Sequence, residues 1–287
     1  MSSISIIIPT LDEELHVGRA VASAAPLGPV HVLDSGSADK TRELAQTAGA
    51  TVAQHPWIGY ATQKNWALGN LGIESEWVLF LDADEYLTPE LREEIASATN
   101  SGKFDGYYIP RQNIFLGRLL RHAWWYPDYQ LRLFRAEKGR YEDRLVHEHV
   151  LLDGQAGFLK QPITHENLKG IDAFVERHRR YAAFEAAEML RVRSGDFGDQ
   201  RRGRFFGSWP ERRRALKLHV WYRLPGRPAI RFLWMYLVKR GFLDGKQGRV
   251  YCQLLAVEEA LINAKLLELE LEQDQVRRKQ GAGRLAP

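Results

Sequence analysis

The chain has 287 residues, of which 45% are hydrophobic, and a formal net charge of +4, a globular composition that allows one large core or a domain with an appendage. Its single cysteine, Cys252, excludes an internal disulfide, and the longest late apolar run, residues 232–238, is far shorter than the roughly 20 residues that span a bilayer. The first residues lack the basic, extended character of a signal peptide, so we expect a cytosolic protein.

The first half of the chain alternates short apolar runs with helix-like segments, which is typical of parallel strands covered by helices. The pattern predicts strands at residues 3–8, 29–34, 51–54 and 76–82, and helices near residues 15–24, 39–48, 61–71 and 89–99. Residues 106–111 and 129–135 predict two more strands that extend the sheet. The sequence therefore predicts an α/β fold with a mixed sheet.

The pattern changes at about residue 171. Residues 171–191 and 248–273 place apolar side chains at helical spacing, and the segment between them is basic, aromatic and interrupted by prolines. The last residues predict a frayed tail. We therefore expect an α/β domain over residues 1–170 and a helical region over residues 171–287.

The first predicted strand ends in Pro9 and Thr10, which are followed by Asp12 and Glu13. Ligands of open α/β sheets bind at the carboxyl ends of the strands, so these polar side chains are candidates for a binding site. Alternatively, the two acids cap the next helix, where the positive end of its dipole favours them.

The second predicted strand ends at Asp34, followed by a Ser-Gly-Ser turn. A carboxylate here can accept a hydrogen bond from a nucleobase or a ribose, or it can close an Asx turn. The Gly-rich G-x-G-x-x-G pattern of dinucleotide sites does not follow the first strand, which argues against a nicotinamide or flavin enzyme.

The predicted strand 76–82 leads into "LFLDADE", which ends in three carboxylates. Asp82 and Asp84 are expected to project together where this strand ends, because side chains two residues apart on a strand face the same side. Two such carboxylates suit Mg²⁺ or Mn²⁺, which relieves their repulsion and takes other ligands from water and phosphates. An acidic turn without a metal is the alternative.

In this order and spacing, "SIIIPTLDEE", "VLDSGSADKT", "QKNWAL" and "LFLDADE" resemble the family 2 glycosyltransferases of the GT-A fold, over roughly residues 3–170. The later stretches "QLRLFR", "YEDRLVHEHV", "PITHENL" and "RFLWMYLVKRGFLDGKQG" are similar to the bacterial subgroup that builds the lipopolysaccharide core and related surface glycans. The resemblance implies a Rossmann-like mixed sheet with helices on both faces, followed by a helical C-terminal region.

The resemblance also implies roles for single residues. It implies that the nucleoside of a nucleoside-diphosphate sugar contacts Pro9, Asp12 and Asp34, with Asp34 at the base, that Lys64 faces a phosphate, that Asp82 lies near the ribose, and that Asp84 holds Mg²⁺ or Mn²⁺. Asp82 is a second candidate metal ligand, and His165 matches a late histidine that completes the metal shell. Arg132 either positions a phosphate or the sugar, or forms a structural ion pair.

An inverting transfer also needs a base for the acceptor hydroxyl, and two carboxylates compete for this role. The resemblance places Glu148, in "VHEHV", at the base position, and Asp143, in "YEDRL", is the rival. Either would have to lie within hydrogen-bond reach of the attacking oxygen.

Residues 201–249 hold fourteen Lys or Arg and only two acids, interleaved with Trp221, Tyr222, Trp234 and Tyr236. Such a segment favours an anionic membrane surface, with cations at the headgroups and aromatic rings at the interface. A helical hairpin with solvated charges is the alternative. We expect a protein peripheral to the inner face of the cytoplasmic membrane, with a second subunit as a further possible partner.

The sequence thus predicts a metal-dependent, inverting glycosyltransferase that moves a sugar, most simply from a UDP-sugar, to a lipid-linked or lipopolysaccharide-type glycan. Three other classes stay open at this point: a nucleic-acid or anionic-surface binder, a nucleotidyltransferase, and a catalytically idle relative. A carboxylate-lined sheet edge would repel nucleic-acid phosphates, so we expect no nucleic-acid partner.

Overall fold

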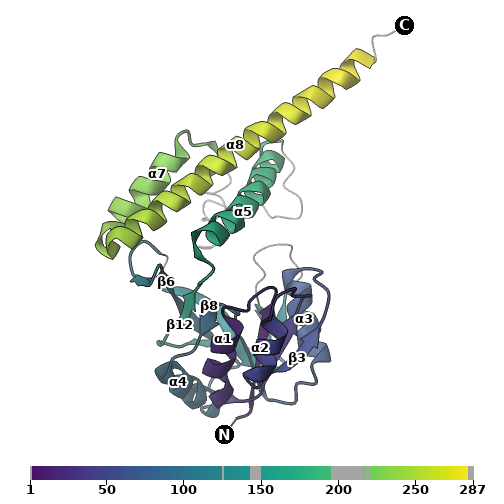
Figure 1. The fold of residues 1–287 in the computed structure, drawn as a ribbon, viewed down its shortest axis with the longest axis vertical. Coiled ribbons are helices and arrows are strands. Elements are labelled where there is room, and N and C mark those ends of the chain that lie inside the picture. The colour runs from purple at the N-terminus through teal and green to yellow at the C-terminus, as the bar shows by residue number, and fades with distance from the viewer. Residues whose placement is uncertain (1, 125, 143–149, 195–215, 217–219, 284–287) are drawn as a thin grey trace. The chain divides into compact units, whose positions relative to one another are not determined.

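The computed structural model describes the chain except for residues 1, 125, 143–149, 195–215, 217–219 and 284–287 (Figure 1). The chain divides into two compact units, Met1–Leu168 and Lys169–Pro287. The first unit holds the sheet, and the second is helical.

A mixed ten-stranded sheet forms the first unit, with the order β3, β2, β1, β4, β8, β6, β12 and β5, and with β7 and β11 paired to β6. The first four of these strands are parallel, whereas β8 is antiparallel to both β4 and β6. The strands are β1 Ile4–Thr10, β2 Val30–Asp34, β3 Thr51–Gln54, β4 Trp77–Phe80, β5 Glu85–Tyr86, β6 Gly106–Phe115, β7 Arg118–Leu120, β8 Asp128–Arg135, β11 Ala156–Phe158 and β12 Ile163–Glu166. A separate pair joins β9 Gly139–Tyr141 to β10 Val150–Leu152.

Helices cover both faces of this sheet, as the sequence predicts (Figure 1). Alternate residues of a strand point to opposite faces, so Ile6 and Ile7 of β1 belong to two different cores, and both are fully buried. Ile6 packs with helices α1 Val17–Ala24, α2 Thr41–Thr47 and α4 Pro89–Asn100, and Ile7 packs with α3 Tyr60–Asn70. A short 3₁₀ turn, η1 Ala25–Leu27, follows α1.

The type of every element predicted for the first unit is confirmed, and most bounds agree within two residues. For α4, the side chain of Thr88 caps the helix by accepting the N–H of Leu91 at 3.3 Å, and Pro89 occupies the first turn. Two strands differ from their predicted ends in ways that matter for the site: β4 stops at Phe80, and β6 continues to Phe115.

The second unit consists of α5 Gly170–Arg193, η2 Trp221–Arg223, α7 Arg227–Leu233, η3 Trp234–Val238, η4 Gly241–Asp244 and α8 Gly245–Gly283. α8 contacts both α5 and α7 (Figure 1). The core includes Ala182, Ala186 and Met189 of α5 and Ile262 and Leu266 of α8.

Tyr222 is also part of this core, with 1% of its surface exposed. Its hydroxyl donates to Oε1 of Glu185 at 2.9 Å. The expectation that Tyr222 lies at a membrane surface is therefore wrong, because the ring is enclosed by α5 and α8. Within the described residues, no helix is both long enough and apolar enough to cross a membrane.

Candidate functional site

The candidate site lies at the sheet edge where β1, β2 and β4 end. The strand register places Thr10 of β1 beside Asp34 of β2, and the half-buried Pro9 beside Leu33. On the other side of β1, the N–H of Leu81 donates to the carbonyl of Ile7 at 3.0 Å, so Asp82 follows at the same edge. This carboxyl edge is where open α/β sheets bind ligands.

The loops that follow β1 and β2 hold each other in place. The N–H of Asp12 donates to Oγ of Ser37 at 2.9 Å, and Oδ1 of Asp12 accepts the N–H of Ala38 at 2.8 Å. Asp12 has a φ of 55°, in the left-handed region that Asp tolerates better than most residues. The N–H of Glu13 donates to Oγ1 of Thr41 at 2.7 Å. α1 has no side-chain cap, so Asp12 and Glu13 join two loops and do not cap the helix.

Asp34 is fully buried and closes the Asx turn that the sequence offers as one alternative. Its Oδ1 accepts the N–H groups of Gly36 at 3.2 Å and Ser37 at 3.0 Å. Its Oδ2 accepts the hydroxyl groups of Thr10, at 3.3 Å, and of Ser37. Gly36 has a φ of 100°, which residues with a side chain rarely adopt. A role of Asp34 in base recognition stays a prediction.

Lys64 of α3 brings positive charge to the carboxyl edge. Its Nζ lies 4.8 Å from the ring centroid of Tyr141, the last residue of β9. The neighbouring Asn65 fixes this arrangement, because its side chain donates to the carbonyl of Tyr141 at 2.9 Å and accepts its N–H at 2.8 Å. The charge of Lys64 is one of the causes that lower the pKa of Asp82.

Asp82 and Glu85 share the guanidinium group of Arg132, on β8. Nη1 and Nη2 of Arg132 donate to Oδ1 and Oδ2 of Asp82 at 3.0 and 2.6 Å, and Nη2 lies 3.5 Å from Oε1 of Glu85. Oε2 of Glu85 accepts the N–H of Asp82 at 3.0 Å. The side chain of Glu85 is fully buried, whereas that of Asp82 is 36% exposed. Arg132 thus forms the ion pair, and Glu85 fixes the turn.

Asp84 contacts β12, the strand that pairs with β5. Its Oδ2 lies 3.1 Å from Nε2 of His165 and accepts a hydrogen bond from Nδ2 of Asn167 at 3.0 Å. Nδ1 of His165 lies 2.7 Å from Oδ1 of Asn113, on β6. An amide oxygen only accepts, so Nδ1 carries the hydrogen, and in a neutral imidazole Nε2 is then an acceptor. Nε2 and the carboxylate of Asp84 thus form a pair that a shared proton or a bound cation can bridge.

Opposing effects set the charges of these acids. Burial raises the pKa of Asp82, but the charge and hydrogen bonds of Arg132 outweigh it and hold the pKa well below its usual range. Burial also raises the pKa of Asp84, and His165 and Asn167 outweigh it in the same way. Burial raises the pKa of Glu85 above its ordinary value. Asp82 and Asp84 are thus both ionised at neutral pH, and the charge of Asp82 acts on Asp84.

Asp82 and Asp84 do not lie on one strand, so the prediction that strand alternation brings them together is wrong. β4 ends at Phe80, and both aspartates lie in the turn before β5. Their side chains contact different strands, because Asp82 bonds to Arg132 of β8 and Asp84 to His165 of β12. The two carboxylates are near each other because of this turn, not because of a strand.

A metal ion fits Asp84 and His165. In the part of the chain that the structure describes, no three His, Cys, Asp or Glu side chains gather as a metal site. Two protein ligands suffice for a hard divalent cation that takes its other ligands from water and phosphates, and a carboxylate with an imidazole suits Mn²⁺. Asp82, the other predicted ligand, has both of its oxygens hydrogen-bonded to Arg132.

The two candidate bases, Asp143 and Glu148, lie outside the described residues. The ends of their segment are described, because Tyr141 of β9 pairs with Val150 of β10. Tyr141 also contacts Lys64. The described residues on either side of it, Tyr141 and Val150, pack with the helix that carries Lys64.

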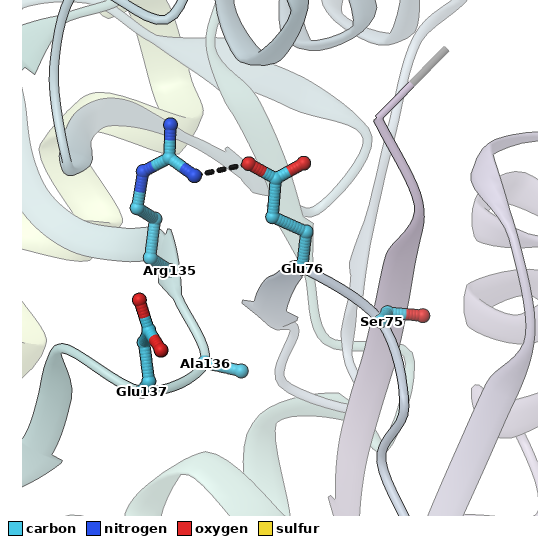
Figure 2. A pocket seen from close by; sticks show the side chains of 5 residues that line it. All are labelled: Ser75, Glu76, Arg135, Ala136 and Glu137. Atoms are coloured by element: carbon cyan, nitrogen blue, oxygen red, sulfur yellow. Dashed lines mark hydrogen bonds and ion pairs between the residues drawn. The ribbon is translucent and has the colours of Figure 1, made fainter.

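A shallow pocket of about 310 Å³ lies elsewhere, lined by Ser75, Glu76, Arg135, Ala136 and Glu137 (Figure 2). Glu76 precedes the first residue of β4, and Arg135 pairs with that residue, so this pocket is at the amino end of β4, away from Asp82. Figure 2 shows the guanidinium of Arg135 paired with the carboxylate of Glu76. These two charges neutralise each other, so the pocket offers no match for the predicted chemistry.

The sheet order, its carboxylate-lined edge and the motifs agree with a comparison against protein families, in which the model of glycosyl transferase family 2 matches residues 5–163. The chain belongs to glycosyl transferase family 2. This confirms the resemblance, the GT-A fold and the class of enzyme. Membership of this family decides against the two alternative classes, a nucleic-acid-binding protein and a nucleotidyltransferase.

Two relatives of this family 2 glycosyltransferase match it over most of their length. The lipopolysaccharide core biosynthesis glycosyltransferase LpsC of Rhizobium meliloti is 29% identical over 272 residues, which cover 89% of this chain and 91% of LpsC. An uncharacterized glycosyltransferase of Rickettsia typhi is 26% identical over 285 residues, which cover 95% of this chain and 89% of the relative.

Solved structures of other glycosyltransferases are also similar. S. aureus TarS 1-349 in complex with UDP-GlcNAc has a TM-score of 0.45 at 16% identity, covering 91% of this chain and 92% of that chain. Glucosyl-3-phosphoglycerate synthase from Mycobacterium tuberculosis in complex with Mn²⁺, UDP and glucosyl-3-phosphoglycerate has a TM-score of 0.34 at 24% identity, covering 39% of this chain and 44% of that chain.

Proposed function

We propose that this family 2 glycosyltransferase is metal-dependent and inverting, and that it moves a sugar from a nucleoside-diphosphate sugar to a lipid-linked or lipopolysaccharide-type glycan. The observation that carries the proposal is the contact of Nε2 of His165 with Oδ2 of Asp84, a pair of side chains that a hard divalent cation can bridge. The match to LpsC, whose name states lipopolysaccharide core biosynthesis, supports the acceptor class.

The donor would lie along the carboxyl edge of the sheet. Asp34, with Pro9, Thr10 and the loop of Asp12, would hold the nucleoside, and a UDP-sugar is the donor that the family resemblance implies. Lys64 would contact a phosphate, and Asp82 would accept a hydrogen bond from the ribose. Arg132 holds Asp82 in place for this contact through two hydrogen bonds.

Asp84 and His165 would hold the Mg²⁺ or Mn²⁺, which when bound supplies positive charge to the leaving diphosphate. Glu148, or its rival Asp143, would take the proton from the acceptor hydroxyl as that oxygen attacks the anomeric carbon. Attack from the face opposite the nucleotide inverts the configuration at that carbon. Lys64 would stabilise the negative charge that develops on the diphosphate.

Residues 1–170 would thus bind the donor and perform the transfer, and residues 171–287 would gather the acceptor and the membrane. We place the protein on the inner face of the cytoplasmic membrane as a peripheral protein, with a homo-oligomer as a further possibility. The basic, aromatic residues of the second unit support this location.

The test is a thermal-unfolding panel with UDP, GDP, ADP, TDP and CMP, each with and without Mn²⁺. A ligand that binds only the folded state raises the melting temperature as its concentration rises. We expect one diphosphate, UDP, to stabilise the protein only with Mn²⁺, and Asp84→Asn to lose this effect. A protein that no nucleotide stabilises with the metal would contradict the proposal and favour the catalytically idle relative.

A further inference from the structure

The outward face of the helix formed by α7 and η3 is apolar. Its exposed side chains are Ile230, Leu233, Trp234, Leu237 and Val238, with exposed fractions from 37% to 60%. The spacing of three and four residues places them on one side of a helix. A surface helix normally turns polar residues outward, so five apolar residues in these positions need an explanation.

The inward face of the same helix carries a buried arginine. Arg227 is 1% exposed, and Nη1 of its guanidinium lies 3.1 Å from Sδ of Met189, on α5. Its Nη2 donates to Oδ1 of Asn263, on α8. Met235, two turns further along, is also buried. The buried contacts of Arg227 and Met235 fix which side of the helix faces α5 and α8, so the apolar side is left outward.

The apolar surface continues into η4. Phe242 is 45% exposed and Leu243 is 50% exposed, and the ring centroid of Phe242 lies 6.1 Å from that of Tyr236 in η3. We call the seven residues the apolar face: Ile230, Leu233, Trp234, Leu237, Val238, Phe242 and Leu243. A contiguous exposed patch of this kind marks an interaction site.

Within residues 220–250, which include the apolar face, the exposed charged side chains are all basic. Over residues 220–250 the sole acid is Asp244, which is buried. The exposed charged residues of this segment are Arg223, Arg240, Lys246 and Arg249. Exposed cations in the same segment as exposed apolar side chains suit a surface that is anionic outside and apolar inside.

We propose that the apolar face inserts into the interface of an anionic lipid bilayer, with Trp234 at the level of the headgroups and the four exposed cations on lipid phosphates. This assigns the membrane contact of the proposed function to particular residues, and it holds whichever sugar is transferred. A second copy of the chain fits less well, because a twofold interface would bring the same cations together. The bilayer supplies the opposite charge.

The test is sedimentation of the full-length protein with vesicles of phosphatidylcholine, alone or mixed with phosphatidylglycerol. We expect the variant Leu233→Glu with Leu237→Glu to bind mixed vesicles at least about tenfold more weakly, because two side chains would no longer enter the interface. The matched control is Val257→Glu with Leu267→Glu on α8, where the original side chains are 50% and 55% exposed, against 50% and 54% for Leu233 and Leu237. The control should bind like the unmodified protein.

A second variant tests the charges. Arg240→Gln, Lys246→Gln and Arg249→Gln together remove three cations, and each should weaken binding to the mixed vesicles roughly fivefold. Binding to phosphatidylcholine alone should change little. Equal affinity of the unmodified protein for both kinds of vesicle would overturn the electrostatic part of the proposal.

Three outcomes would overturn the bilayer as partner. The first is that the Leu233 and Leu237 variant binds vesicles as well as its control. The second is that it loses self-association in analytical ultracentrifugation with unchanged vesicle binding, which would assign the face to a second copy. The third is a lowered melting temperature with unchanged vesicle binding, which would mean that another part of the chain covers the face. Nucleotide-dependent stabilisation, measured without vesicles, reports separately on the proposed function.

Discussion

Nε2 of His165 lies 3.1 Å from Oδ2 of Asp84, although 81 residues separate the two in the chain. The pairing of β5 with β12 brings them together, because His165 lies opposite Glu85, the residue after Asp84. His165 is oriented by Asn113 at Nδ1 and faces the carboxylate of Asp84 through Nε2. Histidine metal ligands have this arrangement, with one ring nitrogen towards the metal and the other fixed by a hydrogen bond. Variants of Asp84 and His165 therefore test the proposed metal site directly.

Asp84→Asn should abolish the Mn²⁺-dependent stabilisation by a nucleoside diphosphate, because an amide oxygen carries no charge to balance the cation. His165→Asn should weaken it and leave part of it, since Asp84 remains. The measurement is the melting temperature with Mn²⁺ at increasing nucleotide concentration. A full response to Mn²⁺ in Asp84→Asn would remove Asp84 from the metal site.

Asn113→Leu should weaken Mn²⁺ affinity by roughly 10- to 100-fold, because the ring of His165 loses the partner that fixes its orientation and tautomer. Titration of Mn²⁺ against the melting temperature measures this. Gln112→Leu is the matched control, since Gln112 is the preceding residue of β6 and its side chain bonds to Oγ1 of Thr164 at 2.8 Å. Equal losses in both variants would point to general damage to β6.

Much of this site follows from the sequence. Apolar periodicity predicts the strands and helices, and parallel strands bring Thr10 and Asp34 to one edge whatever the rest of the fold does. The Asx turn at Asp34 also follows from local sequence, because its partners are two and three residues away. Such contacts join residues that are close in the chain, so they can be predicted from a short sequence motif.

The contacts of Asp82 and Asp84 do not follow from the sequence in the same way. They depend on which distant strands lie beside β4 and β5, and nothing in "LFLDADE" identifies β8 or β12 as neighbours. The sequence therefore leaves Arg132 open between an ion pair and a phosphate ligand, and it gives no signal for Asn113. The sequence signal that places β12 beside Asp84 is the family resemblance of the segment that contains His165.

Arg132→Met should lower the free energy of unfolding by about 3–5 kcal/mol, because it leaves the buried carboxylate of Glu85 without its main partner. Adding Glu85→Gln should restore part of the loss, since the amide is neutral and can still accept the N–H of Asp82. Urea unfolding of the two single variants and the double variant measures the coupling. Losses that simply add would mean that the two side chains do not interact.

Glu148→Gln should leave Mn²⁺-dependent donor binding intact and lower the transfer rate by roughly 10²- to 10⁴-fold, as expected for loss of a general base. Asp143→Asn should have a much smaller effect. Transfer is followed as release of nucleoside diphosphate in the presence of acceptor, and binding by the melting temperature. Near-normal transfer by Glu148→Gln, with loss in Asp143→Asn, would assign the base to Asp143.

In the helical unit, Glu259 predicts a dependence of stability on pH. Its side chain is buried, with Oε2 3.7 Å from Nη1 of Arg227. Burial raises its pKa, helped by the charges of Glu258 and Glu185, and Arg227 and Arg231 oppose the rise only in part. A carboxyl group whose pKa is higher in the folded state stabilises the fold below the unfolded pKa, and this contribution is lost as pH rises through the folded pKa.

The glutamine of the Glu259→Gln variant cannot ionise, so this variant does not lose free energy of unfolding as the pH rises through the pKa of Glu259. The free energy of unfolding of Glu259→Gln, relative to the unmodified protein, should therefore increase as pH rises from about 4 to about 8, measured by urea unfolding at each pH. Glu268→Gln is the control on the same helix, because that side chain is 55% exposed and lies 2.7 Å from Lys265. A difference that stays constant with pH for Glu259→Gln, or the same trend in Glu268→Gln, would mean that burial between α7 and α8 does not control the ionisation of Glu259.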